Sequence, residues 1–169
     1  MNNLKDQLLF IRKGMEVQRF HSLLTVQIET VGHHSCGVAW MAWCLTGGVC
    51  SAALLMSALA HDLPEQHTGD IPSPTKKRMN LESAFHLIDE KYLRDIGMEF
   101  HLSDAEKRIL KMADVLDGAL FCVRERSLGN AEIKSVYNKF IQYLKTHNPV
   151  YREAEVFFAV QQLWDEVDK

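Results

Sequence analysis

Side chains of the kinds that bind metal ions occur at three places along the chain: His34, the adjacent pair His61 and Asp62, and Asp114. His34 comes just before one apolar, helix-forming segment, and His61 and Asp62 close the next one. Asp114 lies inside a further apolar helical segment, where an unpaired buried charge would be costly. Imidazole nitrogens combined with carboxylate oxygens suit a divalent transition metal. These residue types therefore predict a metal centre.

The spacing predicts that the histidines meet. Gly47 and Gly48 indicate a tight turn, and thirteen residues separate Gly47 from His34 and Gly48 from His61. Two antiparallel helices joined at this turn bring the start of the first and the end of the second to one end of a helical hairpin. The hairpin therefore positions both imidazoles for a shared site.

Each of these residues also has a plain structural interpretation. A His-Asp pair alone is weak evidence, because a histidine at a helix end is commonly a cap or a hydrogen-bonded residue. Asp114 could equally be a solvated carboxylate beside Asp117, three residues further along the helix. Only the combination of residue type and spacing favours the metal centre.

Apolar residues recur at helical intervals through most of the chain. The pattern predicts helices over about 2–17, 35–45, 50–61, 80–96, 103–123 or beyond, 130–146, and from 149 onward. Ser103 and Glu106 have the pattern of a capping box, whereas residues 62–75 hold three of the four prolines and should be irregular. No period-2 strand pattern is present. We expect an all-α fold of six or seven helices, with residues 1–169 as a single domain.

Composition restricts the class of protein. Hydrophobic residues make up 47% and charged residues 24%, which is ordinary for a globular domain. The net charge of -3 argues against binding a nucleic-acid polymer.

The apolar stretch 37–60 is broken by the glycine pair, which favours two packed helices over a membrane span. The first twenty residues are charged throughout and lack a secretory apolar run, so we expect a cytoplasmic protein with no membrane partner. The four cysteines have no metal-binding spacing and are expected to be mostly buried, reduced thiols.

Two longer motifs carry a family resemblance. The order His34, His61-Asp62, Asp114 resembles the H…HD…D signature of the HD-domain phosphohydrolases. Residues 29–35 (ETVGHHS) and 61–76 (HDLPEQHTGDIPSPTK) resemble the ENVxEHS and HDxxExxTGDxPTPxK segments of the 5′-deoxynucleotidase branch of that family. Arg19-Phe20 stands where that branch has Arg-Trp, and residues 111–114 (KMAD) resemble its KxAD motif. The resemblance covers about residues 19–122.

The resemblance implies a helical HD-domain bundle and a 2′-deoxynucleotide substrate. Two groups share the pattern: bacterial 5′-deoxynucleotidases, which act on deoxynucleoside monophosphates, and compact phage dATP triphosphohydrolases. The second group releases triphosphate from dATP, which helps a phage replace adenine with 2-aminoadenine. The short connection around the glycine pair looks more like the phage group, and the protein would then act in the host cytoplasm. A nucleotide-binding regulator without catalysis and a purely structural helical protein are the alternatives.

The resemblance also implies roles for single residues. His34, His61, Asp62 and Asp114 would hold a divalent metal: Co²⁺, Mn²⁺, Zn²⁺ or Fe²⁺, with Mg²⁺ as a companion of the phosphates. Asp62 would thereby share in catalysis, and Glu65 would be the general acid or base. An exposed loop carboxylate is the plain interpretation of Glu65.

Substrate contacts are implied nearby. Arg19 and Lys76 would bind phosphate oxygens, and Phe20 would press on the deoxyribose and exclude a 2′-hydroxyl. Phe20 could equally be a core residue. Asp70 would accept a hydrogen bond from the 3′-hydroxyl.

Further candidates carry less weight. Ser22 and His21 could lie near the base, and Lys77 could reach a phosphate, although a solvated basic run explains Lys77 as well. His33 replaces the glutamate usual in the family, which leaves its role open between substitution and solvent exposure. Relatives are homo-oligomers, so a dimer or hexamer is expected, with Trp40 and Trp43 either in the core or at a subunit contact.

Overall fold

The computed structural model describes residues 3–147, 149 and 151–169. Its elements are, in chain order, α1 (Leu4–Met15), β1 (Gln18–Arg19), β2 (Glu29–Thr30), α2 (Val31–Leu45), α3 (Ala52–Ala60), the 3-10 helix η1 (Leu63–Gln66), α4 (Ser73–Arg78), α5 (Glu82–Asp95), α6 (Asp104–Ser127), α7 (Lys134–Thr146) and α8 (Arg152–Val167). The all-α class is confirmed, and β1 and β2 pair antiparallel over only two residues each. Strands this short cannot display a period of two in the sequence.

The predicted number of helices was too small, because the described residues contain eight α-helices. The addition is α4, at the end of the segment expected to be irregular. Pro74 lies in the first turn of α4, where a missing backbone N–H leaves no helical hydrogen bond unmade. The 3-10 helix η1 likewise has Pro64 as its second residue. Proline is therefore compatible with the first turn of these short helices and does not prevent them.

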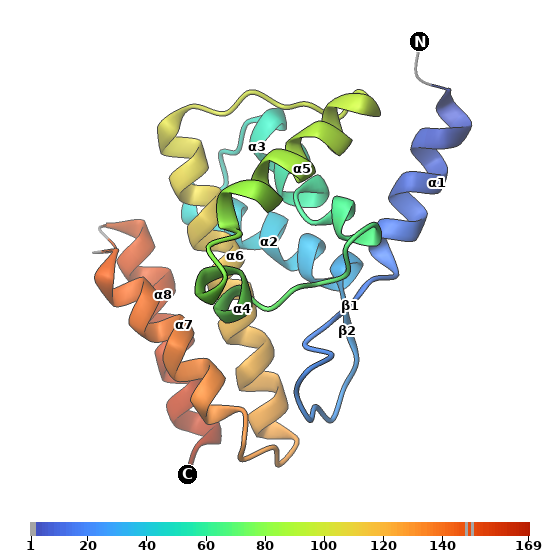
Figure 1. The fold of residues 1–169 in the computed structure, drawn as a ribbon. Helices are drawn as coiled ribbons and strands as arrows, with labels where there is room; N and C mark the ends of the chain where they lie inside the picture. Colours follow the sequence, from blue (N-terminus) through green and yellow to red (C-terminus); the bar gives the residue numbers. More distant parts are fainter. Residues whose placement is uncertain (1–2, 148, 150) are drawn as a thin grey trace.

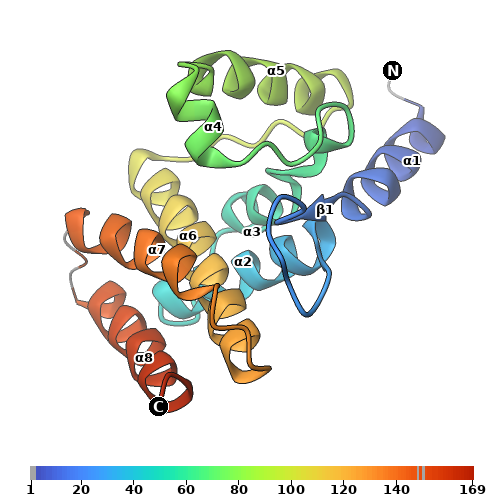
Figure 2. The same ribbon diagram turned by 60° about the horizontal axis from the view of Figure 1, so that its bottom comes forward.

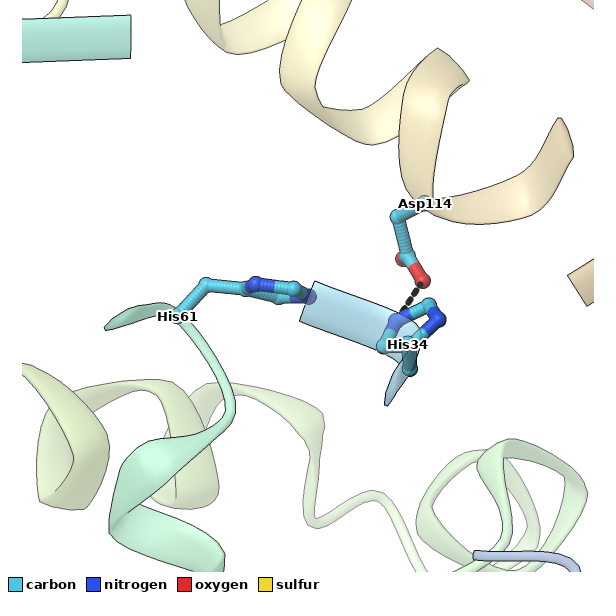
Figure 3. Close-up of side chains that lie close together, drawn as sticks. All are labelled: His34, His61 and Asp114. Atoms are coloured by element: carbon cyan, nitrogen blue, oxygen red, sulfur yellow. Dashed lines mark ion pairs between the residues drawn. The ribbon is translucent and has the colours of Figure 1, made fainter. Parts of the chain in front are cut away.

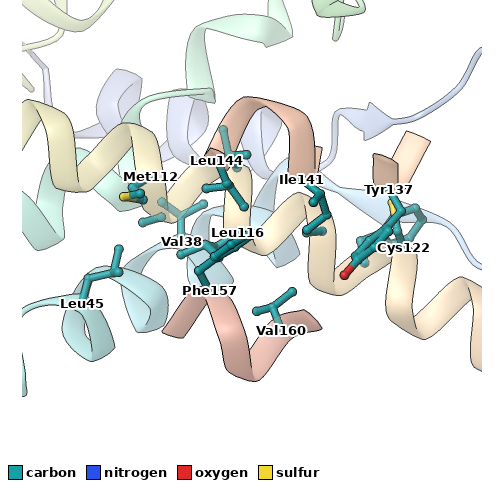
Figure 4. Packing of buried hydrophobic residues seen from close by; sticks show 14 of the residues in the cluster. Val38, Leu45, Met112, Leu116, Cys122, Tyr137, Ile141, Leu144, Phe157 and Val160 are labelled. Atoms are coloured by element: carbon teal, nitrogen blue, oxygen red, sulfur yellow. The ribbon is translucent and has the colours of Figure 1, made fainter. Parts of the chain in front are cut away.

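Helix α6 is the centre of the fold (Figure 1), and it packs against α2, α3, α7 and α8. Its start was predicted correctly: Ser103 and Glu106 form a complete capping box. Figure 4 shows the main core around this helix, where Val38 of α2 and Leu116 of α6 are completely buried and Phe157 of α8 is nearly so. Tyr137 and Trp164 stack with ring centroids 3.8 Å apart, which joins α7 to α8. The apolar stripes of α2, α3, α6, α7 and α8 thus face one shared interior.

The turn between α2 and α3 has the predicted geometry. Gly47 and Gly48 adopt φ values of 65° and 89°, a region that glycine enters without steric cost. Helix α2 begins four residues earlier than predicted, because Thr30 caps it by accepting a hydrogen bond from the backbone N–H of His33. His34 consequently lies inside the first turn of α2 and not before the helix.

A second, smaller core fixes η1 and with it the residues that follow His61. Phe10, Val31, Ala60 and Leu63 are buried together. Gly14 of α1 allows this contact, since a Cβ there would come within 2.7 Å of the Leu63 carbonyl oxygen. Figure 2 shows α4 and α5 as a separate layer beyond α2 and α3. The segment from His61 to Arg78 therefore connects the helical hairpin to this outer layer.

Two predictions from composition can be compared with the described residues. All four cysteines are free thiols, and Cys122 is buried as expected, but Cys36 is exposed because it lies on the outer face of α2. None of the helices in the described part combines the length and apolar character that a membrane span requires.

Candidate metal centre

Three helices bring together three of the four predicted metal ligands. His34 lies in the first turn of α2, His61 follows the last residue of α3, and Asp114 lies in the middle of α6. One ligand atom of each residue lies within 4.8 Å of the others, and Figure 3 shows the three side chains converging. His34 Nε2 and Asp114 Oδ1 are 3.2 Å apart. The mirrored spacing about the glycine turn therefore predicted a real juxtaposition.

Asp62 lies beside this group and faces both imidazoles. Its Oδ2 is 3.6 Å from His34 Nε2 and 3.4 Å from His61 Nε2. The same oxygen accepts a hydrogen bond from Arg19 Nη1 at 3.0 Å. Asp62 is thus held between the two candidate nitrogen ligands and a permanent cation.

Both imidazoles are oriented so that Nε2 remains available to a metal. His61 Nδ1 lies 2.9 Å from the carbonyl oxygen of Ala58, which can only accept, so Nδ1 carries the proton. His34 Nδ1 lies 2.7 Å from Asp117 Oδ2, a carboxylate that acts in the same way. Both Nε2 atoms are buried and have no hydrogen-bond partner. Buried nitrogens of this kind, facing carboxylate oxygens, fit a bound divalent cation.

The charges in the cluster compensate one another. Burial tends to lower the pKa of His34, but the adjacent carboxylates of Asp114 and Asp117 outweigh it and raise the pKa to about 9. Burial tends to raise the pKa of Asp114, yet Lys111 and His34 hold it well below its ordinary value. Lys111 Nζ is 2.6 Å from Asp114 Oδ2. Asp114 is therefore a carboxylate, the form that binds metal.

Glu65 is a carboxyl group near the cluster whose pKa lies well above neutral. It lies in η1 and is buried, and burial together with Asp62 and Asp70 raises its pKa to about 9. Its Oε1 is 3.5 Å from Lys76 Nζ, and its Oε2 has no hydrogen-bond partner. The interpretation of Glu65 as an exposed loop residue is wrong. A protonated carboxyl group in this position can act as a general acid.

Phe20 and Asp70 are in contact, which the sequence did not predict. The backbone N–H of Phe20 donates to Asp70 Oδ2 at 3.1 Å, and Phe20 has a positive φ of 52°. The ring of Phe20 stacks on that of Phe121, with centroids 4.6 Å apart. One face of Phe20 is therefore covered by α6, and the half-buried ring is fixed in place. Arg19 lies over the same ring at 5.6 Å.

The less certain candidates lie outside this arrangement. Ser22, His33 and Lys77 are exposed. His33 is exposed whereas its neighbour His34 is completely buried, so the family glutamate is replaced by a residue that faces solvent. Lys76 is partly buried, close to Glu65, and its ammonium group lies over the ring of Phe85 at 5.5 Å.

Two carboxylates, one partly buried and one completely buried, were not recognised in the sequence as structurally important. Asp117 binds His34, and its position one helical turn after Asp114 is the signal that could have revealed it. Glu125 is completely buried and accepts hydrogen bonds from the backbone N–H groups of Val26 and Gln27, at 2.7 and 2.8 Å. It ties the loop between β1 and β2, which follows Phe20, to the end of α6.

A cavity of about 580 Å³ opens beside the cluster. It lies between α3, α5, α6 and the connection before α6, and its lining includes His61, Asp62 and Asp114. Lys107 and Lys111 of α6 line the same cavity. Asp89, Glu90 and Glu99 add carboxylates to its lining. A small molecule can therefore reach the candidate ligands from this side.

The fold and this arrangement of histidines and carboxylates define a known class. A family model described as an HD domain matches residues 15–149. The chain belongs to the HD-domain phosphohydrolase family. A dATP triphosphohydrolase of Salmonella phage PMBT28 is 30% identical over 172 aligned positions, which cover 93% of this chain and 85% of the relative. A 5′-deoxynucleotidase of Klebsiella pneumoniae is 32% identical over 169 positions, with 86% and 83% covered.

Solved structures share the fold. The HD phosphohydrolase of cyanophage S-2L, whose structure holds dA and one catalytic Zn²⁺ ion, has a TM-score of 0.71 at 17% identity, covering 94% of this chain and 96% of that one. An HD-domain phosphohydrolase from Listeria innocua has a TM-score of 0.73 at 19% identity, with 98% of each chain covered. The whole helical arrangement, including α7 and α8, is therefore common to these proteins.

Proposed function

We propose that this protein is a metal-dependent phosphohydrolase of 2′-deoxynucleotides, and specifically a dATP triphosphohydrolase that converts dATP and water to deoxyadenosine and triphosphate. The observation that carries the proposal is the pair of buried, unpartnered Nε2 atoms of His34 and His61 facing the carboxylate of Asp114. The relative from the Salmonella phage, similar over most of both chains, supports the substrate.

His34, His61, Asp62 and Asp114 would hold the metal. When bound, a divalent ion there polarises a phosphoryl oxygen and makes water a better nucleophile at neutral pH. Zn²⁺ is supported by the cyanophage structure, while the donor set accepts Co²⁺, Mn²⁺ and Fe²⁺ as well. Mg²⁺ would accompany the phosphates of the substrate.

The chain's own residues would perform the remaining steps. Water adds to the α-phosphorus, the bond from phosphorus to O5′ breaks, and O5′ needs a proton to leave as deoxyadenosine. Glu65 holds a proton at neutral pH and would supply it, while the ammonium group of Lys76, 3.5 Å away, stabilises the resulting carboxylate. The proton that the attacking water loses would then return to this carboxylate and restore Glu65. Arg19 would bind a phosphate oxygen through its fork of donors.

The second candidate is a 5′-deoxynucleotidase, which is favoured by the relative from Klebsiella. Both reactions break the same bond between phosphorus and O5′, so one centre suits either, and the substrates differ only in the phosphates beyond the α-phosphate. The relative from the Salmonella phage, aligned over 93% of this chain, supports the longer substrate.

One assay separates the candidates. Purified protein is incubated with Co²⁺ or Mn²⁺ and either dATP or dAMP, and the products are separated by ion-exchange chromatography. Deoxyadenosine and triphosphate from dATP are the expected products. Phosphate released only from dAMP, and from other deoxynucleoside monophosphates, would instead identify a 5′-deoxynucleotidase. Absence of any hydrolysis product would leave a regulator that binds nucleotides.

We further propose the cellular setting. In an infected cell, removal of dATP would favour replacement of adenine by 2-aminoadenine in phage DNA. The four free thiols support a reducing, cytoplasmic location. Residues 1–169 would form one HD domain that assembles as a homo-oligomer, a dimer or hexamer, through a surface that includes Trp40 and Trp43. These rings are 60% and 45% exposed, and light scattering measures the mass of the assembly.

A further inference from the structure

Asp117 of α6 contacts the candidate metal ligand His34 at Nδ1, on the side opposite the nitrogen that faces the metal cluster. Its Oδ2 lies 2.7 Å from Nδ1 of His34, the shortest contact that this imidazole makes with a carboxylate. His34 is completely buried, and the Asp117 side chain is only 14% exposed. Asp114 and Asp117 thus reach opposite nitrogens of one imidazole from positions three residues apart on α6.

The space for the Asp117 carboxylate exists because residue 37 is a glycine. Gly37 lies on α2, three residues after His34. A Cβ built on Gly37 would lie 1.9 Å from Asp117 Oδ1 and 2.6 Å from its carboxyl carbon. No side chain fits there without displacing the carboxylate, so glycine at this position and aspartate on the facing helix form a matched pair.

We propose that Asp117 is a positioning residue for the metal centre and that Gly37 provides the space in which it acts. A carboxylate only accepts hydrogen bonds, so it holds a proton on Nδ1 of His34 and leaves Nε2, on the side of Asp114 and His61, as the nitrogen that a metal would take. The contact also fixes the rotation of the ring. This inference rests on the metal site of the proposed function and adds to it the device that orients one ligand.

The alternative explanation is a simple charge effect, in which Asp117 strengthens metal binding only because any negative group near the site attracts the cation. The two explanations differ for Gly37→Ala. This substitution keeps every charge and moves only the carboxylate, whereas Asp117→Asn removes the charge and allows the amide to rotate and donate. Only positioning predicts that both substitutions weaken metal binding.

The test titrates Co²⁺ alone into metal-free full-length protein, followed by calorimetry and by the visible absorption of the bound ion. We expect Asp117→Asn and Gly37→Ala each to weaken Co²⁺ binding by about 10- to 100-fold, the range found for groups that orient metal ligands. The absorption spectrum of Co²⁺ should also change, because the geometry of the ligands changes. The double variant should bind Co²⁺ no more weakly than Asp117→Asn alone, since both changes act through one contact.

Two matched controls separate positioning from loss of stability. Asp168→Asn removes another aspartate that is 14% exposed and ion-paired. Asp168 follows the last residue of α8 and pairs with Arg126 of α6. Gly118→Ala introduces a methyl group against the ring of Phe140. Both should lower the melting temperature measured in chelator and leave Co²⁺ affinity unchanged.

Each outcome decides the proposal. Unchanged Co²⁺ affinity in Gly37→Ala, or effects of the two substitutions that add in the double variant, would overturn the positioning role while leaving the proposed function intact. Failure of the wild-type protein to bind Co²⁺ would overturn the metal site and this inference together. If Gly37→Ala does not fold, Asp117→Asn and its spectrum still provide the answer.

Discussion

Arg19 Nη1 and Asp62 Oδ2 lie 3.0 Å apart, and this contact joins the small sheet to the metal cluster. Arg19 is in β1 and is also 3.5 Å from Glu29, its partner in the register of β1 and β2. The same Asp62 oxygen faces both imidazoles. Asp62 therefore links the guanidinium group of Arg19 directly to the two candidate nitrogen ligands.

Arg19→Ala should lower kcat/KM on dATP and on dAMP by roughly 30- to 1,000-fold, equivalent to about 2–4 kcal/mol, because a desolvated charged hydrogen bond to phosphate is lost. Arg19→Lys should recover only part of the activity, since an ammonium group lacks the bidentate fork. Steady-state kinetics measures both. Arg12→Ala, which removes an exposed arginine of α1, is the control, and an Arg19→Ala enzyme of normal kcat/KM would remove Arg19 from the phosphate site.

His61→Ala and Asp114→Asn should each abolish stoichiometric metal binding, because each removes one of the few ligands that hold the ion. Elemental analysis by mass spectrometry after dialysis against Co²⁺ measures the metal content. His86→Ala is the matched control: His86 lines the same cavity but is 73% exposed on α5. Full metal content in the His61→Ala protein would support a purely structural role for the histidine.

Phe20→Ala should relax the preference for dATP over ATP by roughly tenfold, because a missing apolar contact changes discrimination by about that factor. The ratio of kcat/KM for the two nucleotides measures this preference. Phe121→Leu provides the control, since it removes the stacking partner of Phe20 and should cost stability while keeping the deoxy preference. An unchanged ratio in Phe20→Ala would mean that Phe20 is a packing residue only.

Glu65→Gln should remove activity and flatten the dependence of stability on pH in metal-free protein. The pKa of Glu65 is raised from 4.5 to about 9, so between these values the folded protein holds a proton that the unfolded chain releases. The stability associated with Glu65 is present below pH 4.5 and is lost as the pH rises toward 9, with a slope of at most about 1.4 kcal/mol per pH unit. The Glu65→Gln variant has no ionisable group at this position, so its unfolding free energy should not show this decrease with pH.

Chemical denaturation in chelator at several pH values between 5 and 9 measures the effect of Glu65→Gln. The difference in unfolding free energy between variant and wild type should increase in favour of the variant as the pH rises. Parallel curves for the two proteins would show that Glu65 is already ionised in the folded state.

The sequence by itself determined the features that depend on local pattern. Helical periodicity and the capping box at Ser103 predicted where α6 begins, and the glycine pair predicted the turn between α2 and α3. The equal distances of His34 and His61 from that turn then predicted their meeting, because an antiparallel hairpin converts equal spacing into proximity. Asp114 was recognised as an anomalous charge in an apolar helix.

Only the tertiary structure decided the contacts that join distant segments. Asp117 binds a histidine 83 residues away, and Glu125 holds backbone groups 98 and 99 residues away. Apart from the spacing between Asp114 and Asp117, their local sequence resembles that of any helical carboxylate. The burial that raises the pKa of Glu65 likewise comes from the packing of η1 between α1 and α5, not from its neighbours in sequence. Local sequence fixes which residue types are available, whereas hydrogen-bond partners and desolvation depend on which helix faces which.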